Sequence, residues 1–423
     1  MKADLIITNA GQLVTCASPG GAKRGAAMLD VGIIKNGAVA ITAGKFVGVG
    51  TSADVLSKFE SGETIDARGQ VVSPGLVDPH THIVYAGDRL DEFEPKIKGA
   101  SYLDIVAAGG GIVSTVKHTR EASIEQLVEQ ASKRLNKMLA CGTTTCEIKT
   151  GYGLDTATEL KMLTVIEDLD RKHQMTIVPT FLAAHTIPTE FRTNPDKYVN
   201  LICETMLSEA WKWFVASDFH GKTPFFCDVF CEIGAFTLAQ TQKILETAKS
   251  LGFKLKAHVD QFTNFGGSRL AIELGAASID HLDAISDAEV AMLARSNTVG
   301  VLIPTENFSA GKIDFANARG MVDAGCSVAI STDYNPGTAP CPSQQVAMAI
   351  ATRYQKLSPT EAFNSATINA AHAIGLGDQT GSIEVGKQAD LLFLDTDDFR
   401  DIPYEFGGNH VSRIFFAGRE VPN

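Results

Sequence analysis

Two histidines separated by one residue follow an apolar segment of the chain. The segment runs from Val71 to Val77, and His80 and His82 lie in the stretch Asp78–His82 that follows it. Because side chains along a β-strand alternate between its faces, the two imidazoles point to the same side and can bind one metal ion. Such a pair also occurs among ordinary core or surface histidines, so it predicts a metal site only with further ligands.

Three more polar residues end apolar runs later in the chain. His258 ends the run 254–258, His281 ends 278–281, and Asp333 ends 329–333. Taken alone, each residue is typical of a hydrogen-bonded strand cap. Imidazole and carboxylate ligands without thiolates suit Zn²⁺, with iron or manganese as substitutes, and a metal-activated water implies hydrolysis.

The elements that would carry these residues are short apolar runs alternating with longer helical stretches. This alternation predicts an α/β fold with a parallel sheet covered by helices, and eight such runs match a (β/α)₈ barrel. Chemistry in that barrel lies at the carboxyl ends of the strands, so all five residues meet at one mouth, after strands 1, 5, 6 and 8. The expected strands are 71–77, 143–148, 176–182, 225–231, 253–257, 277–280, 298–303 and 327–332.

Both ends of the chain have a different texture, with short apolar runs separated by Gly and Asn turns. This pattern predicts β-structure. We expect residues 1–72 and 375–423 to combine into one small β-sandwich domain beside a barrel domain of residues 73–374.

Composition limits the kinds of partner. The 423 residues are 44% hydrophobic and carry a formal charge of −12. That charge argues against nucleic acid, and an anionic small-molecule substrate would need a local cation. The N-terminus lacks a secretory pattern, no run approaches the roughly 18 apolar residues that cross a membrane, and the eight cysteines are scattered. We expect a cytoplasmic protein without a membrane partner, and a homodimer because dimers are the commonest assembly.

The His-x-His segment, the later histidines and aspartate, and the flanking β-structure together resemble the amidohydrolase superfamily. Finer motifs are similar to those of the imidazolonepropionase family, and the resemblance spans nearly the whole chain. These motifs are Ser101–Ile105 leading into Gly109–Val116, Glu147–Leu154, Ala183–His185 and Thr332–Thr338.

The resemblance implies an activity: hydrolysis of the cyclic amide of 4-imidazolone-5-propanoate to N-formimino-L-glutamate, in histidine degradation. It implies one divalent or trivalent metal ion, Zn or Fe, bound by His80, His82, His258 and Asp333. In that reading Asp333 is also the proton acceptor, and His281 hydrogen-bonds the nucleophile or the developing oxyanion.

The resemblance also implies substrate contacts. Arg89 would bind the propionate, although an isolated Arg is more often a solvated surface residue. The other expected contacts are Tyr102, Tyr152, His185, Gln261, Asn335, Gly337 and Thr338. A buried hydroxyl, a capped histidine and a tight Asn-Pro-Gly turn are the ordinary interpretations of Tyr152, His185 and the 335–337 segment.

Three residues bear on the mechanism and the number of ions. Gln261 cannot act as a general base, although some family members carry Glu there. Lys149 ends the second strand, whereas binuclear relatives bridge their ions with a lysine from strand 4, so we expect one ion. Glu232 ends strand 4 and either hydrogen-bonds the site or forms a structural salt bridge.

Two other functions use the same features. A deaminase of a heterocyclic ring would share the metal ligands, but such enzymes commonly carry Glu as a proton shuttle near the position of Gln261. A non-catalytic binding protein is typical of superfamily members that have lost their ligands, and all five residues are present here.

Overall fold

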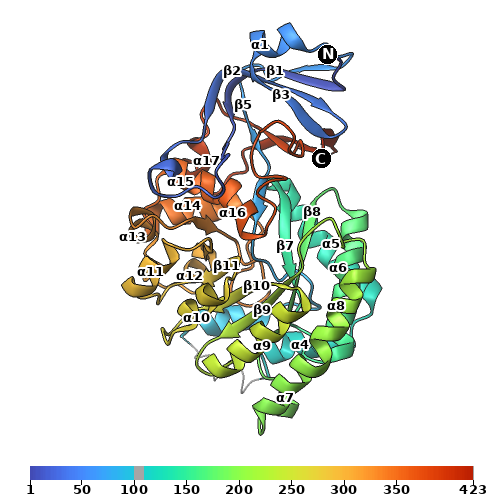
Figure 1. Ribbon diagram of the computed structural model, residues 1–423, viewed down its shortest axis with the longest axis vertical. Coiled ribbons are helices and arrows are strands. Elements are labelled where there is room, and N and C mark those ends of the chain that lie inside the picture. Colours follow the sequence, from blue (N-terminus) through green and yellow to red (C-terminus); the bar gives the residue numbers. More distant parts are fainter. Residues whose placement is uncertain (100–108, 423) are drawn as a thin grey trace.

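The computed structural model describes residues 1–99 and 109–422, and its strands form two eight-stranded sheets. One sheet is a parallel barrel, and the other unites both ends of the chain at the top of Figure 1. The predicted fold class, a (β/α)₈ barrel flanked by β-structure from both termini, is confirmed. The domain limits at residues 72 and 375 stay a prediction.

The barrel strands pair in parallel, in the order β13-β12-β11-β10-β9-β8-β7-β6. Side-chain hydrogen bonds bring the last and first strands together, since Ser331 Oγ and Thr332 N both donate to Asp78. Beyond these strands, Thr81 pairs with Tyr334. The strands are β6 Leu76–Asp78, β7 Thr143–Lys149, β8 Thr176–Ala184, β9 Phe226–Cys231, β10 Lys254–Val259, β11 Ser278–His281, β12 Val299–Leu302 and β13 Val328–Ile330.

Helices surround the barrel (Figure 1). Capping boxes begin four of the helices within residues 1–99 and 109–422, at Ser123, Thr237, Ser286 and Ser358, and a cap of this kind stabilises a helix by about 1 kcal/mol. The helices after the first barrel strand are α2 Phe93–Ile97, α4 Ile112–Glu121, α5 Ile124–Ala140, α6 Thr156–Lys172, α7 Pro195–Leu201, α8 Leu207–Ala216, α9 Leu238–Leu251, α10 Gly267–Leu274, α11 Asp287–Leu293, α12 Pro304–Ser309, α13 Ala318–Asp323, α14 Gln344–Tyr354, α15 Pro359–Ser365, α16 Ile368–Ala373 and α17 Asp401–Tyr404.

The second sheet is mixed, in the order β16-β15-β14-β5-β1-β2-β3, and β4 pairs with β1. The carboxyl-terminal β14 lies between β5 and β15, both of which it meets antiparallel. The strands are β1 Leu5–Val14, β2 Ile33–Thr42, β3 Lys45–Thr51, β4 Thr64–Asp66, β5 Val71–Pro74, β14 Leu391–Leu394, β15 Val411–Phe416 and β16 Arg419–Val421, with helix α1 at Ser52–Lys58.

The expected first barrel strand, 71–77, is in fact two strands that belong to different sheets. β5 ends at Pro74 and β6 starts at Leu76, so the chain passes between the sheets at Gly75. A Cβ on Gly75 would lie 2.0 Å from Oγ1 of Thr144, which only a residue without a side chain avoids. A continuous apolar run gives no sign of this break.

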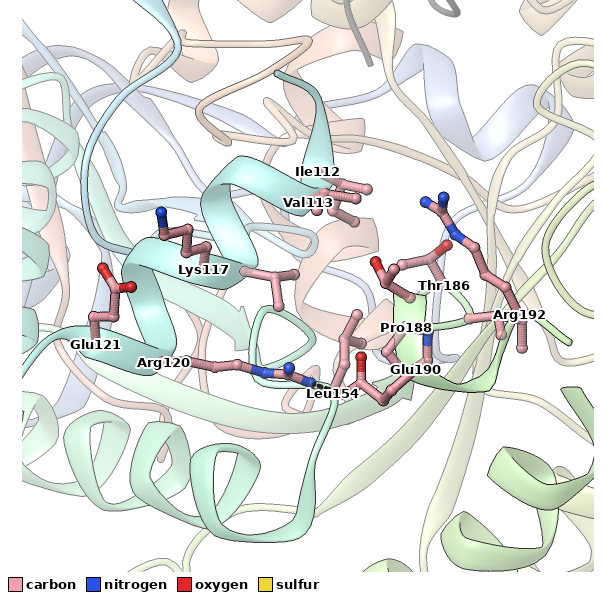
Figure 2. Close-up of a pocket in the computed structure, with 13 residues that line it drawn as sticks. Ile112, Val113, Lys117, Arg120, Glu121, Leu154, Thr186, Pro188, Glu190 and Arg192 are labelled. Carbon is pink, nitrogen blue, oxygen red and sulfur yellow. Dashed lines mark hydrogen bonds and ion pairs between the residues drawn. The ribbon is translucent and has the colours of Figure 1, made fainter. Parts of the chain in front are cut away.

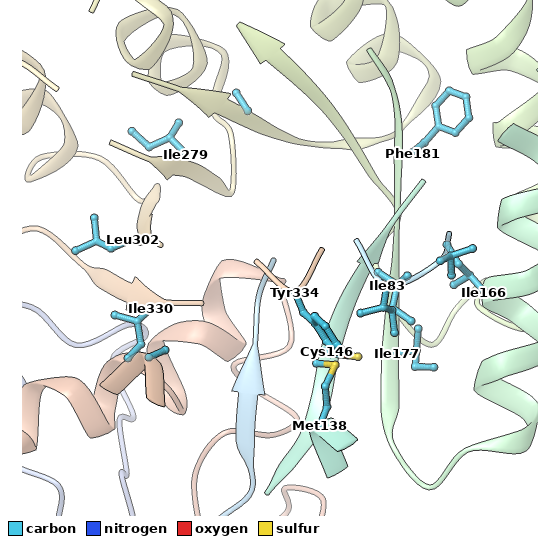
Figure 3. Packing of buried hydrophobic residues seen from close by; sticks show 14 of the residues in the cluster. Ile83, Met138, Cys146, Ile166, Ile177, Phe181, Ile279, Leu302, Ile330 and Tyr334 are labelled. Atoms are coloured by element: carbon cyan, nitrogen blue, oxygen red, sulfur yellow. The ribbon is translucent and has the colours of Figure 1, made fainter. Parts of the chain in front are cut away.

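Alternation along the strands separates the apolar core from the barrel interior. On β7, Cys146 and Ile148 join the main hydrophobic cluster, whereas Glu147 and Lys149 between and after them are buried among charged groups. Figure 3 shows Cys146 near Met138 of α5, and Ile177 near Ile166 of α6. Outward-facing apolar residues thus hold the helices, and inward positions are left for polar chemistry.

None of the described helices has both the length and the apolar composition that crossing a bilayer requires.

Candidate metal centre

Four side chains, from the segment after β6 and from the ends of β10 and β13, lie close together. Nε2 of His82 lies 3.2 Å from Nε2 of His80 and 3.4 Å from Nε2 of His258. Oδ1 of Asp333 lies 3.5 Å from Nε2 of His82 and 3.7 Å from Nε2 of His80. A tetrahedral ion with ligand bonds of about 2.1 Å sets its ligand atoms about 3.4 Å apart, so these separations suit an ion held by the three histidines, with Asp333 beside two of them.

Buried carboxylates orient two of the imidazoles. Nδ1 of His80 lies 2.6 Å from Oδ2 of Asp280, and Nδ1 of His258 lies 3.0 Å from Oδ1 of Asp228. Each carboxylate accepts the Nδ1 proton, which turns the unprotonated Nε2 toward the common point. His82 differs, because its Nδ1 has no hydrogen-bond partner among the described residues and its ring instead stacks on His185.

The imidazoles are in the protonation state that binds a metal. Burial, reinforced by nearby positive charge, holds the pKa of His80 and His82 well below the ordinary value. Burial also lowers the pKa of His258, although Asp228 opposes it. All three rings are therefore neutral near pH 7, with a lone pair available for a cation.

Asp333 and His281 both have backbone conformations that side chains rarely adopt. Their φ angles are +49° and +84°, in the left-handed region. Such strain is found where the surrounding structure imposes a functional position. The ring of His281 lies 5.4 Å from that of His80 and 5.2 Å from that of His258, so it stands beside the centre.

The protonation of Asp333 and His281 is set by their surroundings. Burial raises the pKa of Asp333 to about 8. Burial lowers the pKa of His281, but the hydrogen bond and charge of Glu306 outweigh it and raise the pKa above the ordinary value. Oε2 of Glu306 lies 3.1 Å from Nδ1 of His281, so Nδ1–H donates to it and Nε2 is left for the site.

A charged network lies directly behind the metal ligands, inside the barrel. Nζ of Lys149 lies 2.7 Å from Oδ2 of Asp228 and 2.8 Å from Oε2 of Glu147. Nζ of Lys256 lies 3.0 Å from the same Glu147 oxygen. Although burial lowers the pKa of Lys149, the carboxylates around it raise the pKa above its ordinary value, so the ammonium stays charged.

Two of the expected substrate contacts lie beside His82. The ring of His185 is 4.9 Å from that of His82, and the ring of Tyr152 is 5.4 Å from that of His185. The loop that carries Tyr152 is held by the buried carboxylate of Glu159, which accepts hydrogen bonds from the backbone of Gly151, Gly153 and Leu154. Tyr152 therefore faces the site from a rigid turn.

The expected anion contact, Arg89, lies against the loop after β13. A Cβ on Gly337 would be 2.0 Å from Nη1 of Arg89, so the guanidinium passes directly over this glycine. Lys96 donates from Nζ to the Gly337 carbonyl at 3.0 Å. The side chain of Asn335 organises the same loop: its Oδ1 accepts from the backbone of Gly337 and Thr338, both at 2.8 Å. In the structure, Asn335 therefore stabilises the tight turn that the Asn-Pro-Gly sequence predicts.

Gln261 lies in the loop after β10, and Glu232 directly follows β9. Burial raises the pKa of Glu306, but His281, Lys312 and Gln261 outweigh it and lower the pKa. Glu232 accepts hydrogen bonds from the backbone of Phe262 and Thr263, so it holds this loop in place. Tyr102 lies outside the described residues.

The sequence did not identify the four carboxylates that contact the predicted site residues. They are Asp280 beside His80, Asp228 beside His258, Glu306 beside His281 and Glu92 beside Arg89. A usable signal exists for two of them. Both lie inside buried barrel strands: Asp228 in β9, whose other residues are all apolar, and Asp280 in β11, directly before His281. A charged residue inside such a strand indicates a buried partner, but it does not identify that partner.

A separate surface hollow of 290 Å³ lies between α4 and the segment after β8 (Figure 2). Its described lining includes Leu154, Thr186 and Arg120, but none of the expected metal ligands. Arg120 donates from Nε to the Gly153 carbonyl and pairs with Glu190. The hollow thus adjoins the loops that carry Tyr152 and His185 without being the metal centre.

Comparison with known proteins gives matches over the whole chain. The family model described as Amidohydrolase family matches residues 228–421. An imidazolonepropionase of Chloroflexus aggregans is 50% identical over 419 residues, which cover 99% of this chain and 98% of that protein. An imidazolonepropionase of Herpetosiphon aurantiacus is also 50% identical, covering 99% of this chain and 97% of that protein.

Solved structures share the fold. An adenosine deaminase from Xanthomonas campestris with bound zinc has a TM-score of 0.71 at 20% identity and covers 99% of this chain and 93% of its own. A guanine deaminase from E. coli has a TM-score of 0.71 at 15% identity, with 99% and 98% covered. Identities this low show a common architecture and say nothing of the substrate.

Proposed function

The chain belongs to the imidazolonepropionase family of amidohydrolases, and from that membership we propose how its residues open the substrate ring. It is a metal-dependent hydrolase that cleaves the cyclic amide C–N bond of 4-imidazolone-5-propanoate and forms N-formimino-L-glutamate, a step of histidine degradation. The observation that carries the mechanism is the convergence of three imidazole Nε2 atoms and one carboxylate on a single point.

We assign His80, His82, His258 and Asp333 as ligands of one ion, zinc or iron. When bound, the ion activates a water molecule for attack and polarises the amide carbonyl. A second group of candidate ligands, His80, Glu147 and Asp280, lies beside the first. The ammonium groups of Lys149 and Lys256 already neutralise its carboxylates, which supports a single ion.

Asp333 and His281 carry the protons. As the water oxygen bonds to the carbonyl carbon, the Asp333 carboxylate accepts a water proton. His281, whose Nδ1 is bonded to Glu306, donates from Nε2 to the oxyanion. Asp333 then returns the proton to the ring nitrogen while the C–N bond breaks, so the product has a new carboxylate and an N-formimino group.

Substrate binding falls to residues around this centre. Arg89 binds the propionate through a charge-assisted hydrogen bond, worth about 1.5–3 kcal/mol. Tyr152, His185, Asn335, Gly337 and Thr338 contact the ring or its polar groups, and Tyr102 is assigned by its motif alone. Gln261 contacts substrate or Glu306 but does not act as a base, because an amide cannot accept a proton near neutral pH.

We also propose a cytoplasmic homodimer. All eight cysteines are free thiols, which suits a reducing compartment. Two-fold dimers are the commonest assembly of soluble enzymes, and sedimentation of the purified protein tests this state.

The test of function is hydrolysis of freshly prepared 4-imidazolone-5-propanoate by purified protein, with formiminoglutamate as the product detected. Turnover that chelation abolishes and added metal restores supports both the site and the substrate. A protein that binds one equivalent of metal but leaves this substrate intact would reject the substrate. Ammonia release from aminated purine or pyrimidine rings would then indicate a deaminase.

A further inference from the structure

Five charged side chains form a sealed network inside the barrel. Each is 0% exposed, and they come from four strands of the barrel: β7, and, beyond β8, the consecutive strands β9, β10 and β11. The network consists of Glu147, Lys149, Asp228, Lys256 and Asp280. With three carboxylates and two ammonium groups it has one excess negative charge, and burying such a set is costly unless every member has a partner.

Lys149 holds the central position in this network. Its Nζ lies 2.7 Å from Oδ2 of Asp228, 2.8 Å from Oε2 of Glu147 and 3.7 Å from Oδ2 of Asp280. Lys256 reaches Glu147 at 3.0 Å and Asp280 at 3.5 Å, and it also donates to the carbonyl of Pro79. Among the described residues, Lys149 is the one lysine in contact with Asp228.

The two aspartates in contact with Lys149 are the carboxylates behind the imidazoles. Asp228 contacts Lys149 with Oδ2 and His258 with Oδ1, at 3.0 Å. Oδ2 of Asp280 lies 2.6 Å from Nδ1 of His80. One ammonium group therefore connects, through one carboxylate each, to two of the three imidazoles that converge on the metal position.

The chemistry of this arrangement is specific. Asp228 orients His258 with Oδ1 while Lys149 holds its Oδ2, so its carboxylate cannot rotate freely, whereas Oδ2 of Asp280 contacts both His80 and Lys149. Two buried carboxylates also repel each other unless a cation stands between them. A hydrocarbon side chain at position 149 would fill the same space but do neither.

We propose that Lys149 is a positioning residue of the metal centre: its ammonium group fixes Asp228 and Asp280, and through them the ring orientations of His258 and His80. This inference rests on the metal ligands assigned above. It predicts that the affinity for metal, before any substrate is present, depends on the charge of Lys149.

The test uses metal binding instead of turnover. Metal-free wild-type protein and variants are titrated with Co²⁺, and the affinity and visible absorption of the bound ion are recorded. Lys149→Met removes the ammonium group but leaves an extra buried negative charge that can unfold the protein. The double variant Lys149→Met with Glu147→Gln keeps the net charge of the network and spares both aspartates, and Glu147→Gln alone is its matched control.

We expect Glu147→Gln to bind Co²⁺ almost as the wild type does, because the contacts of Lys149 with Asp228 and Asp280 remain in this variant. The double variant should fold, with an unchanged circular dichroism spectrum, but bind Co²⁺ about 10–100-fold more weakly and with altered visible absorption. Equal affinity and equal absorption in the double variant and its control would overturn the inference alone. Failure of the wild type to bind Co²⁺ would instead reject the metal ligands themselves.

Discussion

The carboxylate of Glu92 accepts hydrogen bonds from one edge of the Arg89 guanidinium, through Nε and Nη2. Nε of Arg89 lies 2.9 Å and 3.0 Å from the two carboxylate oxygens, and Nη2 lies 2.8 Å from one of them. Burial raises the pKa of Glu92, but bonds from Arg89, Lys96 and the Gly111 backbone outweigh it and lower the pKa to about 2. Glu92 thus stays ionised at all working pH values and sets the direction in which Arg89 points.

Replacing Arg89 tests the anion contact. Arg89→Met keeps the length of the side chain but loses the charge, so KM for 4-imidazolone-5-propanoate should rise about 10–100-fold, the equivalent of about 1.5–3 kcal/mol. Steady-state kinetics measure this. A ring analogue without the carboxylate is the control, since the same substitution should leave its kcat/KM nearly unchanged. An equal loss on both compounds would show that Arg89 does not recognise the propionate.

Gly337→Ala should reproduce part of that defect without touching the arginine. Its new Cβ would lie 2.0 Å from Nη1 of Arg89, so the guanidinium must move. We expect KM to rise by about tenfold, roughly 1.4 kcal/mol, with unchanged metal content. Gly408→Ala is a matched control because a Cβ there meets nothing within 4 Å. Wild-type KM in Gly337→Ala would contradict the placement of Arg89.

Glu306→Gln tests the protonation of His281. Glu306 raises the pKa of His281 above its ordinary value despite burial, and the protonated ring is the hydrogen-bond donor of the mechanism. Activity that needs this proton is lost as pH rises through that pKa. Removing the charge lowers the pKa, so the alkaline limb of the kcat profile should move down by about one pH unit or more. Glu246→Gln, on the exposed face of α9, should leave the profile unchanged. An unshifted limb in Glu306→Gln would assign the limb to another group.

Metal binding by the metal-free protein should depend on pH through Asp333. Burial raises the pKa of Asp333 to about 8, so below that pH the carboxyl must lose a proton before it binds a cation. Co²⁺ affinity should therefore increase up to about tenfold per pH unit below pH 8 and level off above it. Titrations between pH 6 and 9 measure this slope. Asp333→Asn should bind Co²⁺ more weakly, and its affinity should change less steeply with pH. If the pH dependence were the same as in the wild type, the proton released on metal binding would belong to a group other than Asp333.

Strand ends were the best-predicted part of the molecule. His258 and His281 were expected where apolar runs stop, and in the structure they lie at or next to the last residue of β10 and β11. Parallel strands in a barrel bring their carboxyl ends to one mouth, so convergence followed from the topology alone. The residue types then limited the chemistry to a metal-dependent hydrolase.

Contacts between side chains from distant elements were beyond this reasoning. Glu306 reaches His281 from the start of α12, and Asp228 of β9 reaches both Lys149, two strands away on β7, and His258 on the adjacent β10. A buried carboxylate has several partners within reach, and rotamers and packing decide among them. The passage between sheets at Gly75 was missed for a similar reason, because β5 and β6 have the same apolar texture.

The position of β14 has a consequence for the order of folding. β14 pairs with β5, so Leu391 lies opposite Pro74, and β5 adjoins the strand that starts the barrel. A ribosome must therefore deliver almost the entire polypeptide before this sheet can be completed. Until then the edge of β5 presents unpaired backbone groups to any other extended chain. A nascent or prematurely terminated polypeptide that lacks its last strands thus exposes a site for aggregation, even with every barrel strand already synthesised.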